Sequence, residues 1–221
     1  MRNSYHDDLS TVVDDLIRMA DMVRAAVSTS TKALLEADIR SAEKVISEDE
    51  AIDDSHTDIE GRCFALLARQ APVASDLRTV VSALRMVTAM ERMGDLAAHV
   101  AKIARMRFPD GAVPTDLRPN FERMAKLADL MVAKASETLR TRDVALAAEL
   151  AKIDEEMDDL RRDQFRIILD DSWSHGIEAA VDVALLGRYY ERIADHAVTL
   201  GRRVAFVVTG ENDDQATWSS N

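Results

Sequence analysis

Apolar residues recur at three- and four-residue steps along most of the chain, which is the periodicity of one buried face of an α-helix. One such run consists of Leu77, Val80, Val81, Leu84 and Val87. All four prolines fall between residues 72 and 119, so the segments 1–71 and 120–221 lack the strongest helix breaker. No alternating pattern of the kind found in β-strands competes with this spacing. The pattern predicts an all-α protein built from long helices.

Two aspartates and one proline-containing stretch divide the helical pattern. Asp38 and Asp143 each follow a leucine-bearing segment. An aspartate at such a position can accept a hydrogen bond from a free backbone N–H at the start of a new helix. The stretch MRFPDGAVPTDLRP, residues 106–119, is the only one that resembles a linker between domains.

The two halves of the chain repeat one another. When the two capping aspartates are aligned, the hexamer DEAIDD (49–54) lies on DEEMDD (154–159) without a gap. Further on, MERMGDLA (90–97) matches YERIADHA (190–197), with five residues fewer between the motifs in the second half. We expect this difference in length to lie in a turn. The repeat predicts two tandem three-helix bundles with six long helices in all.

The repeat also sets the expected domain limits. The first three-helix repeat is expected at residues 1–107, a linker at 108–116 and the second repeat at 117–209. The remaining residues, 210–221, are polar and acidic, which predicts a disordered tail.

Helices two and three of the first half are expected to form an antiparallel hairpin. In such a hairpin, residues at one height have numbers with a constant sum, because both helices rise by about 1.5 Å per residue. This relation places Glu50 level with Asp95, and Asp54 level with Glu91, when the tip of the hairpin lies next to Pro72. A proline suits that turn.

The second half gives the same geometry. Glu155 is expected level with Asp195, and Asp159 level with Glu191, when the tip lies beside Gly176. Turn residues thus coincide with the midpoints of acidic pairs in both halves. Each half is therefore predicted to bring four carboxylates together from two helices.

The recurrence of these pairs carries more information than their spacing. Forty acidic residues in 221 give about seven pairs at a four-residue separation by chance, so most such pairs are solvated surface charge. Glu91, however, continues the apolar stripe of Leu77 and Leu84 at seven-residue steps, so it is expected to point toward the bundle. A carboxylate there is costly unless it is paired or bound to a metal ion.

Four converging carboxylates could hold arginines or a hard cation. Arg92 and Arg192 directly follow the two glutamates, but neighbouring helix residues point about 100° apart, so each arginine is expected to point away from the site. Metal is therefore the preferred reading. Oxygen ligands suit magnesium, calcium or manganese, and carboxylates with open positions also hold iron, zinc or nickel. The predicted ligands are Glu50, Asp54, Glu91, Asp95, Glu155, Asp159, Glu191 and Asp195.

Further candidate ligands stay open at this point. A second acidic register could widen the sites or be exposed, and it consists of Asp49, Asp53, Asp154 and Asp158. His99 lies four residues after Asp95 and could add a nitrogen ligand, but the repeat has Thr199 in its place. For a single histidine of this kind, a surface or core-edge role is the more common one.

Composition excludes several classes of function. Forty acidic residues against 28 basic ones give a formal net charge of −12, which repels nucleic acid and anionic lipid. The single cysteine, Cys63, allows no disulfide within the chain and suits a reducing compartment. The first residues lack the apolar run of a signal peptide, and no stretch reaches the apolar length of a membrane span. A cytoplasmic protein is expected, with neither nucleic acid binding nor direct membrane insertion.

Signatures of catalysis are missing from the sequence. It contains no glycine-rich phosphate loop, no GxSxG and no CxxC, so no catalytic or organic cofactor-binding residues are assigned and an enzyme is not expected. A carboxylate-bridged di-iron oxidoreductase would need Glu-x-x-His on two helices. The nearest approach, Asp53 to His56, occurs once and uses aspartate.

The repeated segments ERMGDLAAHVAKIA and ERIADHAVTLGRRV, together with the two acidic hexamers, resemble the PhoU family of regulators associated with bacterial phosphate-specific transport. The resemblance covers about residues 5–209. Segments such as LLEAD and GRYYERIADHAV are similar to actinobacterial, PhoY-like members of the family. Two positions depart from the family pattern, namely His99 where asparagine is frequent and Ala194 where glycine is usual.

The resemblance implies a fold, a ligand and partners. It implies tandem three-helix bundles, frequent homodimers and metal clusters held by the acidic motifs, which on this chain are the eight residues given above. It also implies a negative regulator of phosphate uptake and of the phosphate-starvation response, which acts through the ATPase of the phosphate transporter and a membrane sensor histidine kinase. A metal-free helical adaptor or scaffold remains an alternative. Carboxylates repel phosphate, so direct phosphate binding would require a metal ion or arginines elsewhere.

Overall fold

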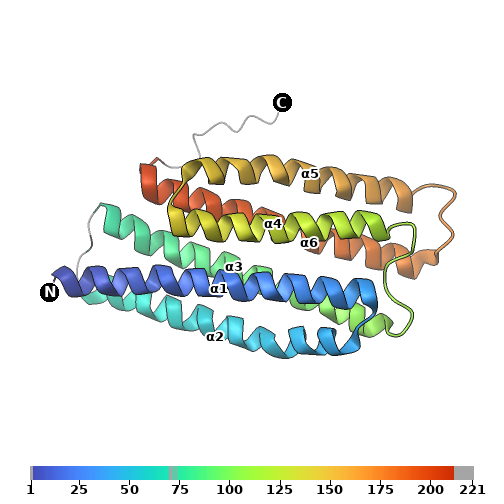
Figure 1. Ribbon diagram of the computed structural model, residues 1–221, viewed down its shortest axis with the longest axis horizontal. Helices are drawn as coiled ribbons and strands as arrows, with labels where there is room; N and C mark the ends of the chain where they lie inside the picture. Colours follow the sequence, from blue (N-terminus) through green and yellow to red (C-terminus); the bar gives the residue numbers. More distant parts are fainter. Residues whose placement is uncertain (1, 70–71, 73, 212–221) are drawn as a thin grey trace.

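The computed structural model describes residues 2–69, 72 and 74–211, and these residues form α-helices joined by short loops, with no β-strand (Figure 1). The prediction of an all-α protein with six long helices is confirmed. The helices are α1 (Arg2–Glu36), α2 (Ile39–Arg69), α3 (Ser75–Arg107), α4 (Arg118–Thr141), α5 (Val144–Ile168) and α6 (Gly176–Thr209).

The six helices form two three-helix bundles, as predicted. Helices α1, α2 and α3 contact one another, and α4, α5 and α6 do the same. The bundles join where α3 packs against α6 and α1 packs against α4 (Figure 1). Helix α3 ends at Arg107 and α4 begins at Arg118, so the loop between the bundles occupies the proline-containing stretch.

Helices α3 and α6 run antiparallel at the junction of the bundles. Near the end of α3, Arg107 forms an ion pair with Asp182, which lies near the start of α6. Further back along α3, the ring of His99 stacks on that of Tyr189, with 5.4 Å between ring centroids. The position on α6 rises as the position on α3 falls, which fixes the antiparallel direction.

Both predicted capping aspartates start a helix. The side chain of Asp38 accepts hydrogen bonds from the backbone N–H groups of Arg40 and Ser41, at 3.0 and 3.2 Å. Asp143 accepts one from the N–H of Ala145 at 2.8 Å. These bonds satisfy N–H groups that have no partner within the helix, which explains where α2 and α5 begin.

The predicted hairpin tips fall between helices. Helix α2 ends at Arg69 and α3 begins at Ser75, with Pro72 between them and residues 70, 71 and 73 outside the described residues. In the second half, α5 ends at Ile168 and α6 begins at Gly176. Gly176 has φ of 80°, a backbone conformation that favours glycine.

The five-residue difference between the halves lies in a helix, so the prediction that it lies in a turn is wrong. Helix α2 has 31 residues and α5 has 25, although both begin directly after a capping aspartate. Apolar periodicity continues in α2 through the buried residues Cys63 and Leu66, which keeps those turns helical. The extra turns lie beyond the acidic hexamer.

The predicted tail begins at residue 210, and residues 212–221 lie outside the described residues. Gly210 ends α6 in the left-handed conformation, with φ of 76°, and its backbone N–H donates to the carbonyl oxygen of Phe206 at 2.9 Å. Of the described helices, none combines the length and the apolar character that crossing a membrane requires.

Close packing between α5 and α6 depends on Gly201. A Cβ atom at this position would lie 2.8 Å from Cδ1 of Leu150 and 3.3 Å from the backbone Cα of Ala147. We expect G201V to lower the free energy of unfolding by about 1–3 kcal/mol, because a larger side chain would force the two helices apart. Thermal unfolding followed by circular dichroism measures this change.

Gly61 provides the matched control for this prediction. It is exposed in α2, and no atom lies within 4 Å of the place where its Cβ would be. We expect G61A to stabilise the protein by up to about 1 kcal/mol, because alanine is the better helix former. Equal destabilisation by both substitutions would contradict the packing argument.

Candidate metal centre

Four carboxylates from α2 and α3 form the first acidic cluster, which consists of Asp49, Asp53, Glu91 and Asp95. Burial raises the pKa of Asp49, and the charges of Asp95 and Asp53 raise it further. The missing side chain of Gly94 lets the helices approach, since a Cβ there would lie 3.0 Å from Cδ1 of Ile52 on α2, and Oδ1 of Asp49 lies 3.6 Å from the same position. The side chain of Asp49 thus faces α3.

Glu91 belongs to this cluster through its interactions with Asp95 and Asp53. Its side chain is 20% exposed, so it points toward the bundle as predicted. Burial raises its pKa, the charge of Asp95 adds to the increase, and Arg92 and His56 act in the opposite direction. The cluster therefore favours partial neutralisation by a proton or by another positive charge.

The second acidic cluster is the counterpart between α5 and α6, and it consists of Asp154, Asp158, Glu191 and Asp195. Burial, followed by the charges of Asp195 and Asp158, raises the pKa of Asp154 to about 7. Oδ1 of Asp154 is buried and has no hydrogen-bond partner. A buried acceptor without a donor is costly, so this oxygen needs a positive ligand or a proton.

Two further aspartates of the second cluster also have a raised pKa. Burial raises the pKa of Asp158 and of Asp195, and in both cases the charge of Glu191 adds to the increase. Glu191 itself is buried and accepts hydrogen bonds from Arg161, at 2.7 Å, and from Arg188. Arginines thus reach one side of this cluster.

The register of the clusters differs by one residue from the expected one. The α2 and α5 carboxylates that face α3 and α6 belong to the second register, which the sequence left open. The predicted ligands Glu50, Asp54, Glu155 and Asp159 occupy the next position of their helices and are exposed, as Asp53 and Asp158 also are, whereas Asp49 and Asp154 are half-buried. Whether any of these residues binds a metal ion stays a prediction.

The expectation that the arginines point away from the glutamates is wrong for Arg92. Its guanidinium lies 3.5 Å from Oε2 of Glu91 and 3.4 Å from Oδ2 of Asp95. A long arginine side chain can fold back along the helix, which the angle between neighbouring Cα–Cβ bonds does not capture. Sequence reasoning also missed Arg161 and Arg188, although Arg161 stands one heptad after Asp154.

His99 lies beside the first cluster. It is exposed, stacks on Tyr189 of α6, and its charge acts to lower the pKa of Asp49. Its role as a nitrogen ligand stays a prediction.

The carboxylates of the two clusters are suitable ligands for a hard cation, but they do not converge on one point. All eight groups of the two clusters are carboxylates, the ligand type that magnesium, calcium and manganese prefer. Within residues 2–69, 72 and 74–211, no three histidine, cysteine, aspartate or glutamate side chains converge closely enough to hold a metal ion. The mutual repulsion of these groups and the orphaned oxygen of Asp154 are the observations that favour a cation.

The family model of the PhoU domain matches the chain twice, at residues 16–104 and 121–204, and each match contains one acidic cluster. The chain belongs to the PhoU family. It is 44% identical to the phosphate-specific transport system accessory protein PhoU homolog 1 of Mycobacterium leprae, with 98% of each chain covered. It is 46% identical to PhoU homolog 2 of Mycobacterium tuberculosis, over 95% of this chain and 99% of that one.

Solved PhoU structures share the fold. The crystal structure of PhoU from Pseudomonas aeruginosa superposes with a TM-score of 0.86 at 28% identity, and covers 94% of this chain and 100% of its own. The phosphate transport system regulatory protein PhoU from Streptococcus pneumoniae gives 0.84 at 26% identity, over 94% and 98%. These names describe accessory and regulatory proteins, and none of them describes a catalytic activity.

Proposed function

We propose that this PhoU-family protein is a metal-binding negative regulator of phosphate uptake and of phosphate-starvation signalling, and not an enzyme. The observation that carries the proposal is the pair of acidic clusters, one in each PhoU domain. Burial, and after it the charge of neighbouring carboxylates, raises the pKa of Asp49 and Glu91 in the first and of Asp154, Asp158 and Asp195 in the second. Family membership supplies the connection to phosphate transport.

The ligands are proposed to come from the first acidic cluster in one half and from the second in the other. Iron, zinc, manganese, nickel, calcium or magnesium would supply the positive charge that these carboxylates lack. Such a charge would tie α2 to α3 and α5 to α6, because each cluster takes two residues from each helix of a pair. The ligands predicted from the sequence, Glu50, Asp54, Glu155 and Asp159, would flank these sites.

The proposed setting is the cytoplasm, where the protein would act as a homodimer. It would regulate the ATPase of the phosphate transporter and a membrane sensor histidine kinase. The net charge of −12 disfavours nucleic acid as a partner and direct insertion into membranes. Competition experiments with the purified ATPase and kinase would identify the surface involved.

Elemental analysis of protein purified without an affinity tag tests the metal sites. We expect several ions per chain after incubation with the six metals. The variant D49N/D53N/E91Q/D95N should lose about half of them, because it removes the ligands of one cluster. The variant D154N/D158N/E191Q/D195N should lose the other half.

The one-residue difference in register supplies a matched control. The variant E50Q/D54N/E155Q/D159N removes four acidic charges from the same stretches of helix but leaves both clusters intact. We expect it to retain its metal. Loss of metal in this variant alone would show that the four residues changed in it are the ligands. Absence of metal from the native protein would contradict metal binding.

A metal-free helical adaptor is the second candidate, and the arginines favour it. Arg161 and Arg188 neutralise Glu191, while Arg92 contacts both Glu91 and Asp95. In this case the cluster variants would still repress phosphate uptake in a bacterium that lacks its own regulator. Loss of repression together with loss of metal would support the first proposal instead.

A further inference from the structure

A cavity of about 720 Å³ is lined by residues from the first turns of α1 and α3 and the last turns of α4 and α6. These helix ends lie together at the left of Figure 1. Residues from both bundles line it, because α1 and α3 belong to the first bundle and α4 and α6 to the second. The cavity is distant along the helices from both acidic clusters. It therefore belongs to neither candidate metal centre.

Three arginines converge on this cavity from two helices. They are Arg78 near the start of α3, and Arg140 and Arg142 at the end of α4. Among the described residues, neither Arg78 nor Arg142 has a carboxylate within 4 Å, the distance that defines an ion pair. Arg140 has only a distant one, 3.8 Å away on Glu137. The positive charges are thus available to a ligand.

Arg78 lies beside the second bundle. Its Nε atom is buried and has no hydrogen-bond partner. The guanidinium carbon lies 3.4 Å from the position that a Cβ atom would take on Gly210, the residue that ends α6. A buried donor without an acceptor at the wall of a cavity is the feature that a bound oxyanion would satisfy.

The charges around the cavity favour an anion. Besides the three arginines, two carboxylates line it, those of Asp14 and Asp76, which leaves a positive excess in a strongly acidic protein. The N-terminus of α3 has no side-chain cap and contributes free backbone N–H groups. The C-termini of α4 and α6 oppose that dipole, so the arginines decide the sign.

We propose that this cavity binds a small phosphoryl oxyanion, such as inorganic phosphate or pyrophosphate, through Arg78, Arg140 and Arg142. The planar guanidinium fork matches phosphoryl oxygens, and the hydroxyl group of Ser75 on the same wall can donate to them, whereas that of Thr79 donates to the backbone carbonyl oxygen of Ser75 at 2.9 Å. Binding there requires no metal ion. Because both bundles contribute walls, an occupied cavity would link the two PhoU domains.

The site goes beyond the proposed regulatory function and can fail independently of it. If the protein regulates phosphate transport as proposed, the cavity gives it a direct means of responding to phosphate. Treating the protein with a chelator before each titration separates the two proposals, since a metal-bound phosphate would then be lost and an arginine-bound phosphate would remain.

Isothermal titration of chelator-treated protein with inorganic phosphate and with pyrophosphate, at fixed ionic strength, tests the site. We expect saturable binding of at least one of them. R140Q/R142Q should weaken it at least tenfold, while R40Q/R85Q, which removes two exposed arginines elsewhere, should change it less than twofold. Circular dichroism confirms that both variants are folded.

A third variant is expected to bind the anion more tightly than the native protein does. D14N removes a carboxylate that repels the anion, so it should tighten binding at least twofold. Absence of saturable binding by the native protein would overturn the proposal. Equal weakening in R140Q/R142Q and R40Q/R85Q would also overturn it, because the effect would then follow net charge and not this cavity.

Discussion

Replacement of Arg107 by alanine is expected to lower the melting temperature of the protein by roughly 5–10 °C, because it leaves a buried carboxylate without its partner. Asp182 on α6 has a side chain that is only 5% exposed, and Arg107 at the end of α3 neutralises it. An ionised carboxylate that stays buried alone is among the most destabilising changes that a single substitution can cause.

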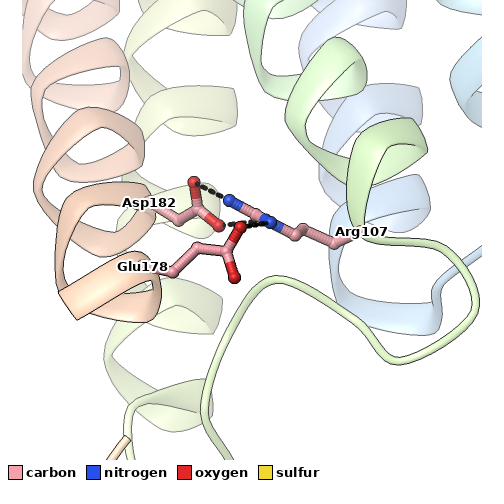
Figure 2. Close-up of polar contacts among 3 residues, drawn as sticks. All are labelled: Arg107, Glu178 and Asp182. Atoms are coloured by element: carbon pink, nitrogen blue, oxygen red, sulfur yellow. Dashed lines mark hydrogen bonds and ion pairs between the residues drawn. The ribbon is translucent and has the colours of Figure 1, made fainter. Parts of the chain in front are cut away.

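The geometry of this contact explains its strength. Figure 2 shows the guanidinium of Arg107 facing Asp182 and Glu178, both on α6. Nε donates to one carboxylate oxygen of Asp182 at 2.5 Å and Nη2 donates to the other at 3.2 Å. Such a bidentate pair is short and directional. It also joins the two bundles, because α3 and α6 belong to different ones.

Two further variants separate the buried contact from the exposed one. Glu178 is 75% exposed, so E178Q should change the melting temperature by less than about 2 °C. The double variant R107A/D182N should melt above R107A, because asparagine carries no charge that needs a partner. A double variant as unstable as R107A would show that the loss comes from arginine packing and not from the stranded charge.

The sequence was sufficient to predict the fold because its signals are local. Asp38 and Asp143 mark helix starts by a hydrogen bond to residues two positions later, which depends on no distant part of the chain. The turn beside Gly176 needs a backbone conformation that glycine favours. Because the chain repeats, each helix start and each turn is marked once in each half. The order of the helices therefore follows without tertiary information.

The register of the carboxylates was harder to predict, because the height of a residue along its helix does not determine the direction in which its side chain points. The constant sum fixes the height of a residue on its helix, and a shift of one residue changes this height by only about 1.5 Å. The same shift turns the side chain by about 100°. The heptad of α2 carries the missing information: Ala42, Asp49, His56 and Cys63 share one face, and its two ends are buried.

Contacts between the bundles could not be predicted from the sequence. Arg107 and Asp182 are 75 residues apart, and no periodicity within one helix relates them. The cavity around Arg78 and Arg142 likewise depends on how the second bundle sits against the first. Only the relative placement of the two bundles, set by α3 against α6, brings these groups together.

The two acidic clusters should make the stability of the metal-free protein fall as the pH rises from 5 to 8. Asp154 has a pKa of about 7 in the folded protein and about 3.8 in the unfolded chain, so the folded state binds more protons between these values. Stability therefore decreases with pH across this window. After a discount for solvent screening, the loss is about 2 kcal/mol.

Bound metal should reverse this dependence. A metal ion binds the ionised carboxylates, so its stabilisation grows as the pH rises and protons leave. At a free metal concentration of one hundred times Kd, each site adds about 2.7 kcal/mol, which corresponds to roughly 5–10 °C in melting temperature. Thermal unfolding at several pH values, with chelator and with each metal, measures both effects.

D154N should remove most of the pH dependence of the metal-free protein and raise its melting temperature at pH 8. It removes the carboxylate whose pKa is raised to about 7 by burial and by neighbouring negative charges. D170N is the matched control. Hydrogen bonds from Ser172 lower the pKa of Asp170, so its contribution is lost only as the pH falls below about 4. The slope between pH 5 and 8 should stay the same in that variant. A native protein whose stability is flat across this range, with and without metal, would contradict the view that the clusters hold unbalanced negative charge.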